Sequence, residues 1–236
     1  LYDNLGGKTK IPKSSKVFFA RQYQNILQSK FTEGFRYYDV QVDDKKLVEM
    51  NIDDAKKMGA IIAEDTKVIN ANRIDNYWEI TLNNNEKIKS KILINAAGPW
   101  INEIVNNVLK INAKKSIRLV RGSHIITKKL YEEEVAFTLQ NEDNRIVFVI
   151  PYKGKYSLIG TTEVDVNTPD NPTISDEEKI YLINTINNHF IKQISEKDIL
   201  DTFSGIRPLI EDFKDASKVT RDYVFDLNLE NKNSPL

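Results

Sequence analysis

Residues 118–125 read Arg118-Leu119-Val120-Arg121-Gly122-Ser123-His124-Ile125, and residues 204–209 read Ser204-Gly205-Ile206-Arg207-Pro208-Leu209. Each stretch places a cationic or titratable side chain beside a glycine, inside an apolar run that is typical of a strand. Burying a charge in a strand is costly unless that charge meets a partner. His124 and Arg207 are therefore candidates for an anion site or an acid–base step. A neighbouring carboxylate could equally satisfy each of them.

The first stretch opens a run of strands without intervening helices, from about residue 116 to residue 166. We predict strands over residues 117–127, 135–140, 145–152 and 156–161, separated by short turns. Such a meander predicts a largely antiparallel sheet, and with it a second structural unit. A helix is predicted next over residues 176–190, with a capping box at residues 175–178. Its helical spacing predicts three buried side chains, Ile180, Ile183 and Ile186.

The pattern differs on either side of this meander. Residues 1–35 are polar and are predicted to be irregular. A helix is predicted over residues 42–58, capped by Asp43 or Asp44 and ended by Gly59. Its spacing predicts a buried face made of Leu47, Met50, Ile52, Ala55 and Met58. Strands are predicted over residues 61–71, 77–82 and 88–94, with a hairpin turn at residues 83–85, and later over residues 199–203 and 218–227.

The strand over residues 88–94 ends in a turn of small residues, Asn95-Ala96-Ala97-Gly98. Its last part, Ile92-Leu93-Ile94, is an unbroken apolar run typical of an interior strand of a parallel sheet. Pro99 suits the first turn of a helix over residues 100–109. Ligands of α/β proteins bind at the carboxyl ends of strands, and small residues there let a nucleotide approach the backbone. A tight turn that merely needs small residues is the alternative.

Composition excludes several classes of function. The 236 residues contain 34 Lys and Arg against 34 Asp and Glu, so no net charge attracts nucleic acid or an acidic membrane surface. The chain has no cysteine, which excludes disulfides, thiolate catalysis and cysteine-based metal sites. It has 2 histidines, far apart in the sequence, which argues against a histidine-rich metal site. No apolar run approaches the roughly 18 residues of a membrane span. We therefore expect no metal and no nucleic-acid partner.

Six motifs occur in an order that closely resembles the middle of the FAD-dependent glycerol-3-phosphate dehydrogenases of the aerobic, bacterial type. These enzymes belong to the D-amino-acid-oxidase-like flavoprotein group. The motifs are residues 93–100, the segment with His124, residues 139–151, residues 158–165, the segment with Arg207, and residues 220–223. Any one motif alone would be a weak signal. Their number and order make the resemblance specific, and it runs nearly from end to end of the chain.

The resemblance implies an α/β fold with mixed α+β character. A partial, Rossmann-like FAD-binding domain would cover residues 1–110, and an antiparallel substrate-binding sheet, or cap, would interrupt it over residues 111–203. Residues 204–236 would return toward the FAD domain. The implied cofactor is FAD, and the residues implied to contact it are Val68, Ala96, Ala97, Gly98 and Trp100.

The implied reaction is the oxidation of sn-glycerol 3-phosphate to dihydroxyacetone phosphate, with electrons passed to quinone. The protein would be cytoplasmic and peripheral, on the inner face of the bacterial cell membrane. Oxidising a secondary alcohol calls for a base with a pKa near neutrality, a role that histidine suits and that we assign to His124. Arg207 is expected to act in catalysis and, with Arg221, to bind the phosphate. Arg118 and Arg121 are expected to be structural or solvent-facing.

The chain contains no Gly-x-Gly, the core of the loop that holds a dinucleotide pyrophosphate in this family. We therefore expect an internal piece of a longer flavoenzyme that in isolation binds no FAD and is inactive. Two alternatives stay open. One is another oxidase of the same flavoprotein group, acting for example on an amino acid. The other is a non-catalytic fragment.

Overall fold

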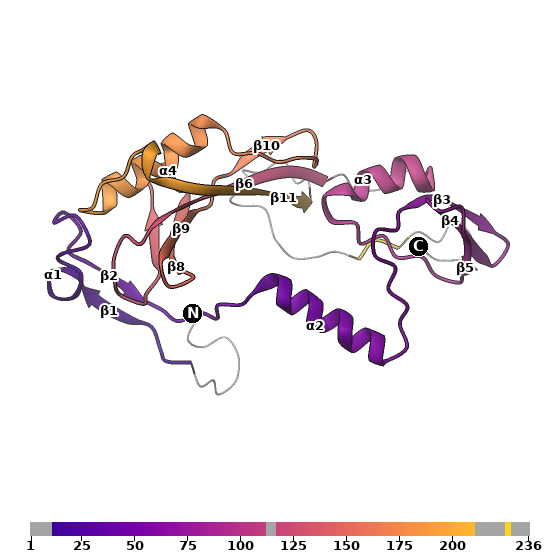
Figure 1. Ribbon diagram of the computed structural model, residues 1–236, viewed down its shortest axis with the longest axis horizontal. Helices are drawn as coiled ribbons and strands as arrows, with labels where there is room; N and C mark the ends of the chain where they lie inside the picture. Colours follow the sequence, from indigo (N-terminus) through magenta and orange to yellow (C-terminus); the bar gives the residue numbers. More distant parts are fainter. Residues whose placement is uncertain (1–10, 112–116, 211–224, 228–236) are drawn as a thin grey trace. The chain divides into compact units, whose positions relative to one another are not determined.

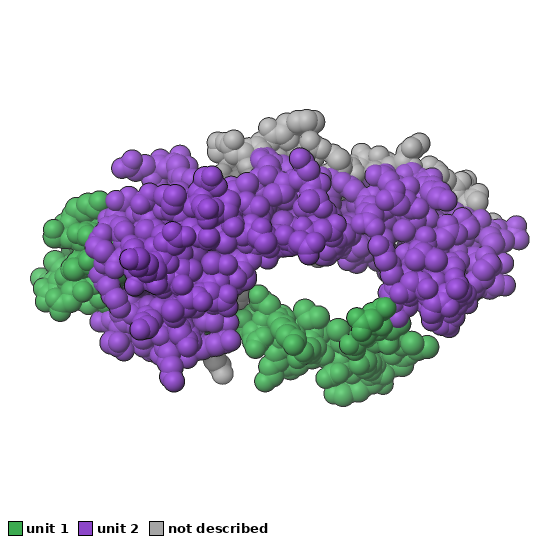
Figure 2. Space-filling view, turned by 45° about the horizontal axis from the view of Figure 1, so that its top comes forward, with its two compact units in different colours: residues 1–65, 189–191 green, residues 66–188, 192–236 purple. Residues whose placement is uncertain are grey.

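The computed structural model describes residues 11–111, 117–210 and 225–227. The chain forms two compact units, one of residues 1–65 with 189–191 and one of residues 66–188 with 192–236 (Figure 2). The division expected at residues 110 and 203 stays a prediction. Residue 203 lies inside a continuous strand, described below.

The smaller unit contains a two-stranded antiparallel sheet of β1 (Ser15–Phe18) and β2 (Glu33–Arg36), with the short helix α1 (Phe19–Gln22) after β1 (Figure 1). The prediction that residues 1–35 are irregular is therefore wrong in part. Strands of four residues are too short to leave a readable alternation in the sequence. The buried side chains of this segment are Val17, Tyr23, Ile26 and Leu27.

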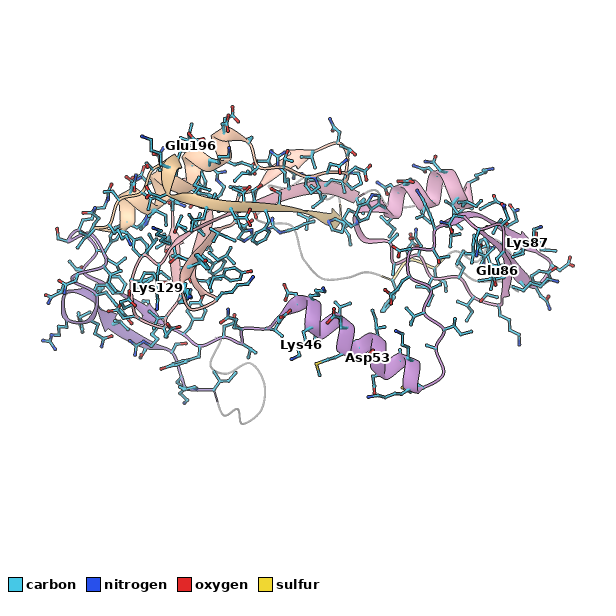
Figure 3. All side chains as sticks on the ribbon, viewed as in Figure 1. Lys46, Asp53, Glu86, Lys87, Lys129 and Glu196 are labelled. Carbon is cyan, nitrogen blue, oxygen red and sulfur yellow. The ribbon has the colours of Figure 1, made fainter. Side chains whose placement is uncertain are left out.

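Helix α2 (Asp44–Lys57) forms where it was predicted. Asp43 caps it by accepting a hydrogen bond from the Lys46 amide at 3.0 Å, and Gly59 follows with φ +95°. The predicted buried face is wrong, because no residue of α2 is buried and Met50 and Met58 are 61% and 84% exposed. Helical spacing decides which side chains share a face, but it does not supply the element that covers them. Figure 3 labels Lys46 and Asp53 on this helix.

A three-stranded antiparallel sheet opens the larger unit. It consists of β3 (Val68–Ile74), β4 (Tyr77–Leu82) and β5 (Lys87–Ser90), and the predicted hairpin turn lies between β4 and β5. Figure 3 labels Glu86 and Lys87 there, and the Lys87 ammonium lies 2.9 Å from Glu79. The following helical segment comprises η2 (Gly98–Trp100), α3 (Ile101–Glu103) and η3 (Ile104–Leu109). Sheet and helix share one core of Ala71, Trp78, Ile80, Leu82, Val108 and Leu109.

The structure corrects the strands predicted on either side of this sheet. β5 ends at Ser90 and is antiparallel to β4, and Ile92 and Ile94 are 56% and 79% exposed. Within the described residues, no strand pairs with residues 91–95. Similarly, the strand predicted from residue 61 begins only at Val68. An apolar run shows that a segment suits burial, whereas a strand also needs a neighbour that completes its hydrogen bonds.

The main sheet confirms the predicted meander. Its strands are all antiparallel: β6 (Ile117–Lys128), β7 (Phe137–Gln140), β8 (Ile146–Tyr152), β9 (Tyr156–Gly160), β10 (Val164–Val166) and β11 (Ile199–Ile210). β6 is the central strand. β11 pairs along one side of it for nearly its whole length, while β9 and β10 share the other side. The mixed α/β class with an antiparallel sheet, expected from the sequence, is thus confirmed.

Helix α4 (Asp176–His189) follows β10 and begins with the predicted capping box, in which Ser175 and Glu178 exchange hydrogen bonds of 2.8 and 3.3 Å. Ile186 is fully buried as predicted, but Ile180 is 57% exposed and Leu182 is buried instead. In the sheet, alternate residues of β6, β8 and β9 are fully buried: Ile125, Val147, Val149 and Ile159. Of the strand predicted over residues 218–227, only residues 225–227 are described, and they are not in a strand.

Candidate active site on the main sheet

Strand register brings His124 and Arg207 to the same face of the main sheet. His124 of β6 lies opposite Phe203 of β11 and opposite Gly160 of β9. Directly opposed residues in antiparallel strands share a face, and so do residues two apart along a strand. Arg207, four residues after Phe203, therefore shares the face of His124. We call this face, with Gly122, His124, Gly160, Phe203, Gly205 and Arg207, the open face.

The imidazole of His124 lies flat between an aromatic ring and a bare backbone. It stacks on Phe203, with ring centroids 4.7 Å apart and planes inclined by 8°. It also covers Gly160, where an added Cβ would lie 2.2 Å from His124 Cδ2. Its Nδ1 is buried and has no hydrogen-bond partner among the described residues. A side chain at residue 160 would displace the ring.

Burial, and then the charge of Arg207, lower the pKa of His124 from 6.5 to about 4. The sequence led us to expect a base with a pKa near neutrality. The pKa of His124 in the structure is lower than that. Desolvation disfavours the imidazolium, and a nearby cation disfavours it further. The ring is consequently neutral at pH 7 and able to accept a proton.

The guanidinium of Arg207 lies over Gly122, where an added Cβ would come within 2.4 Å of Nη2. Nη2 donates a hydrogen bond to Thr161 Oγ1 at 2.8 Å. Thr161 therefore fixes the direction of the planar group. A guanidinium held flat in this way suits bidentate recognition of a phosphate or a carboxylate.

The two arginines of β6 are paired with carboxylates, in agreement with the structural roles expected for them. Arg118 forms an ion pair with Asp165 of β10. Arg121 forms one with Glu178 of α4, at 2.6 Å.

Glu178 anchors a buried polar network on the side of β6 opposite the open face. Its Oε1 accepts hydrogen bonds from the hydroxyls of Ser123 at 2.8 Å and Thr162 at 2.5 Å, and its Oε2 accepts from Arg121 and from the Ser175 amide. Burial raises the pKa of Glu178. The hydrogen bonds from Thr162, Ser175, Ser123 and Arg121 outweigh this effect, so its pKa lies below the ordinary value.

This network lies directly behind the candidate site. Ser123 precedes His124 in β6, and Thr162 follows Thr161, which accepts from Arg207. The Ser123 amide also donates to Thr162 Oγ1 at 2.9 Å. Sequence reasoning recognised Glu178 only as part of a capping box. No sequence signal indicates that a residue of α4 reaches residues 16 and 55 positions earlier in the chain, as the hydrogen bonds to Thr162 and Ser123 require.

The small-residue turn after β5 is held by Asn95. Its Oδ1 accepts from the Ala97 amide at 3.3 Å, and its Nδ2 donates to the Ile101 carbonyl at 3.2 Å. Gly98 has φ +54°, and an added Cβ there would meet no described atom within 4 Å. The segment η2, which begins at Gly98, contacts β11, the strand of Arg207. The small-residue turn and the strand of Arg207, both singled out in the sequence, are thus in contact within the larger unit.

The remaining predicted site residues have different surroundings. Trp100 is 42% exposed, and its Nε1 donates to Asp170 at 2.9 Å. Val68 packs against the core of the three-stranded sheet. Arg221 lies outside the described residues.

Two features are absent from the described residues. No helix in this part of the chain is long and apolar enough to cross a membrane. No group of histidine and acidic side chains there is arranged to hold a metal ion.

Residues 15–226 match the family model described as FAD dependent oxidoreductase. The chain belongs to this family. It is 40% identical over its whole length to a glycerol-3-phosphate dehydrogenase of Pseudomonas aeruginosa and 37% identical to a D-erythritol 1-phosphate dehydrogenase of Brucella abortus. It covers 47% and 48% of these two proteins, so the chain spans about half the length of the curated relatives it matches. The resemblance seen in the motifs is thereby confirmed.

Solved structures support the same fold. The glycerol-3-phosphate dehydrogenase of Bacillus halodurans, determined in complex with FAD, aligns with a TM-score of 0.71 at 20% sequence identity. The alignment covers 84% of this chain and 45% of that one.

Proposed function

We propose that this chain carries the substrate-recognition face of an enzyme that oxidises sn-glycerol 3-phosphate to dihydroxyacetone phosphate with FAD. The observation that carries the proposal is the juxtaposition of a half-buried imidazole and an oriented guanidinium on one open sheet face. The names of the two relatives above support it, because both designate dehydrogenases of phosphorylated polyols.

Arg207 would bind the phosphate of the substrate, and Arg221 would be a second ligand. A phosphomonoester offers several oxygens to a planar donor fork, so binding is strong and directional. Thr161 holds the guanidinium in place before the substrate arrives, which lowers the entropy lost on binding.

His124 would take the proton of the substrate hydroxyl as hydride leaves the carbon that bears this hydroxyl. The neutral ring is the form that accepts a proton, and Phe203 and Gly160 keep it in one orientation. A phosphate dianion bound beside Arg207 would offset part of the positive charge through which Arg207 lowers the pKa of His124. The pKa of His124 would then rise above about 4, while burial, the larger cause of its low value, remains, and the ring becomes a stronger base.

FAD fits the region around the small-residue turn. At Gly98 the backbone is bare and the space beside it is open among the described residues, and η2 contacts the strand that bears Arg207. Ala96, Ala97, Gly98, Trp100 and the backbone of Val68 would contact the cofactor. Bound FAD would supply the acceptor for the hydride.

Electrons would pass onward to quinone, and the protein would contact the cytoplasmic face of the bacterial cell membrane peripherally. These two proposals come from the resemblance to aerobic glycerol-3-phosphate dehydrogenases.

The proposed function is tested with the natural polypeptide that carries this chain, reconstituted with FAD. Its activity is measured with an artificial electron acceptor on sn-glycerol 3-phosphate, on glycerol and on glycine. We expect dihydroxyacetone phosphate from the first substrate and little turnover of the others. Preferred turnover of glycine would assign the protein to the amino-acid oxidases instead. Flavin binding without turnover of any substrate would contradict the proposal.

A further inference from the structure

Gly205 lies on the open face between Phe203 and Arg207 of β11, one strand away from His124. It is two residues from Phe203 and two from Arg207 on β11, and it pairs with Gly122 of β6. An added Cβ at residue 205 would meet no described heavy atom within 4 Å, and the residue is exposed. Its φ is outside the left-handed region. Neither backbone conformation nor packing among the described residues therefore requires glycine here.

The other two glycines of this face are different. The space above Gly122 is occupied by the guanidinium of Arg207, and the space above Gly160 by the imidazole of His124. Among the described residues, Gly205 is thus the one of these three positions with open space above it.

The dimensions of this space suit a short ligand. The guanidinium lies over Gly122, two residues before His124 in β6, and two residues along a strand span about 7 Å. A phosphate at Arg207 and a carbinol carbon at His124 would be joined by a short carbon chain passing over Gly205.

We propose that Gly205 is a specificity-determining residue, whose missing side chain leaves room for the carbon chain of the phosphorylated substrate between Arg207 and His124. The proposal rests on the proposed function and deepens it. A methyl group at residue 205 would occupy this room without touching any described atom of the protein.

The inference predicts opposite effects on stability and on activity. Alanine is preferred over glycine inside a strand, so Gly205→Ala should leave stability unchanged or raise it. The same change should lower kcat/KM for sn-glycerol 3-phosphate by roughly 10-fold to 200-fold, the discrimination that a single methylene group produces in a fitted pocket. Gly205→Val should lower it further. Inhibition by inorganic phosphate, which needs the phosphate ligands but not the room above Gly205, should stay nearly as in the wild type.

Gly154→Ala is a matched control from the turn between β8 and β9. An added Cβ at residue 154 also meets no described atom, but φ is +69°, so this variant should lose stability and keep its kcat/KM. The experiment uses the FAD-loaded natural polypeptide, with Gly205→Ser as an additional variant should Gly205→Val not fold.

Wild-type turnover separates this inference from the proposed function. An inactive wild type contradicts the proposed function, and with it the inference. An active wild type together with unchanged kcat/KM in Gly205→Ala and Gly205→Val overturns the inference alone. Equal losses of phosphate inhibition and of glycerol 3-phosphate turnover also overturn it, because they would show that Arg207 had been displaced.

Discussion

The imidazole of His124 lies parallel to the ring of Phe203, at a centroid distance of 4.7 Å and an inclination of 8°. The two residues are directly opposed across β6 and β11, so their contact is set by strand register. Phe203 is itself 48% exposed. It covers one side of the imidazole, and the rest of its ring lies half-exposed on the open face.

Replacing Phe203 with a smaller side chain should change the titration of His124. Burial is the main cause of its low pKa, so Phe203→Ala should raise that pKa from about 4 toward 6.5. An NMR titration of the imidazole resonances measures the change. Leu200→Ala on the same strand, where the side chain is 50% exposed, is the control and should leave the pKa unaltered. A pKa near 4 in both variants would mean that Phe203 does not shield the ring.

Stability should depend on pH through His124. Its pKa is lower in the folded protein than in the unfolded chain, so the unfolded chain binds more protons between about pH 6.5 and pH 4. The free energy of unfolding should therefore fall as the pH is lowered through this window, by up to about 3 kcal/mol. His124→Gln should remove this part of the dependence. Urea denaturation at a series of pH values compares the two proteins, and parallel curves would contradict the prediction.

The sequence predicted the main sheet well, because alternation and short turns are local signals. It failed where an element depends on a distant neighbour. The apolar run at Ile92 and Ile94 has no strand partner within the described residues, and no apolar residue of α2 is buried. In both places the pattern indicates a preference for burial, which only tertiary packing can satisfy.

Glu178→Gln should destabilise the protein strongly, because it removes the charge that compensates Arg121 and places amide hydrogens against donors. Breaking a buried pair from one side costs about 3–5 kcal/mol. Thermal or urea unfolding measures the loss. Glu177→Gln, at the exposed neighbouring position, should change stability by less than about 0.5 kcal/mol.

The stabilising effect of Glu178 should also weaken in acid. Its pKa in the folded state lies below the ordinary carboxyl value, so its contribution is complete above that value and is lost as the pH falls below it. A Glu178→Gln variant as stable as the wild type at neutral pH would show that the network contributes little.

Gly122→Ala should weaken anion binding without removing any charge. The new Cβ would lie 2.4 Å from Arg207 Nη2, so the guanidinium has to move away from Thr161. Inorganic phosphate should therefore bind less tightly, by about 10-fold or more if one charge-assisted hydrogen bond is lost. Isothermal titration calorimetry on wild type and variant measures this. Unchanged affinity would mean that the position of Arg207 above Gly122 has no part in binding.

The candidate site was only partly visible in the sequence. His124 and Arg207 stood out because each is a polar residue beside glycine in an apolar strand, and the structure brings them to one face. Phe203 and Gly160 contact His124, and Thr161 binds Arg207, only because strands far apart in the chain pair in one register. No local sequence pattern contains that register. The low pKa of His124 likewise depends on burial and on a cation 83 residues later in the sequence.

The recognition of phosphate by Arg207 is tested most directly by the rate at which substrate bleaches the flavin of the FAD-loaded natural polypeptide. The rate is compared for sn-glycerol 3-phosphate and for glycerol, in wild type and in Arg207→Ala. We predict that the variant loses about 2–5 kcal/mol of the stabilisation that favours the phosphorylated substrate, while its slow reaction with glycerol hardly changes. Equal losses with both substrates would contradict the proposal and make Arg207 a structural residue.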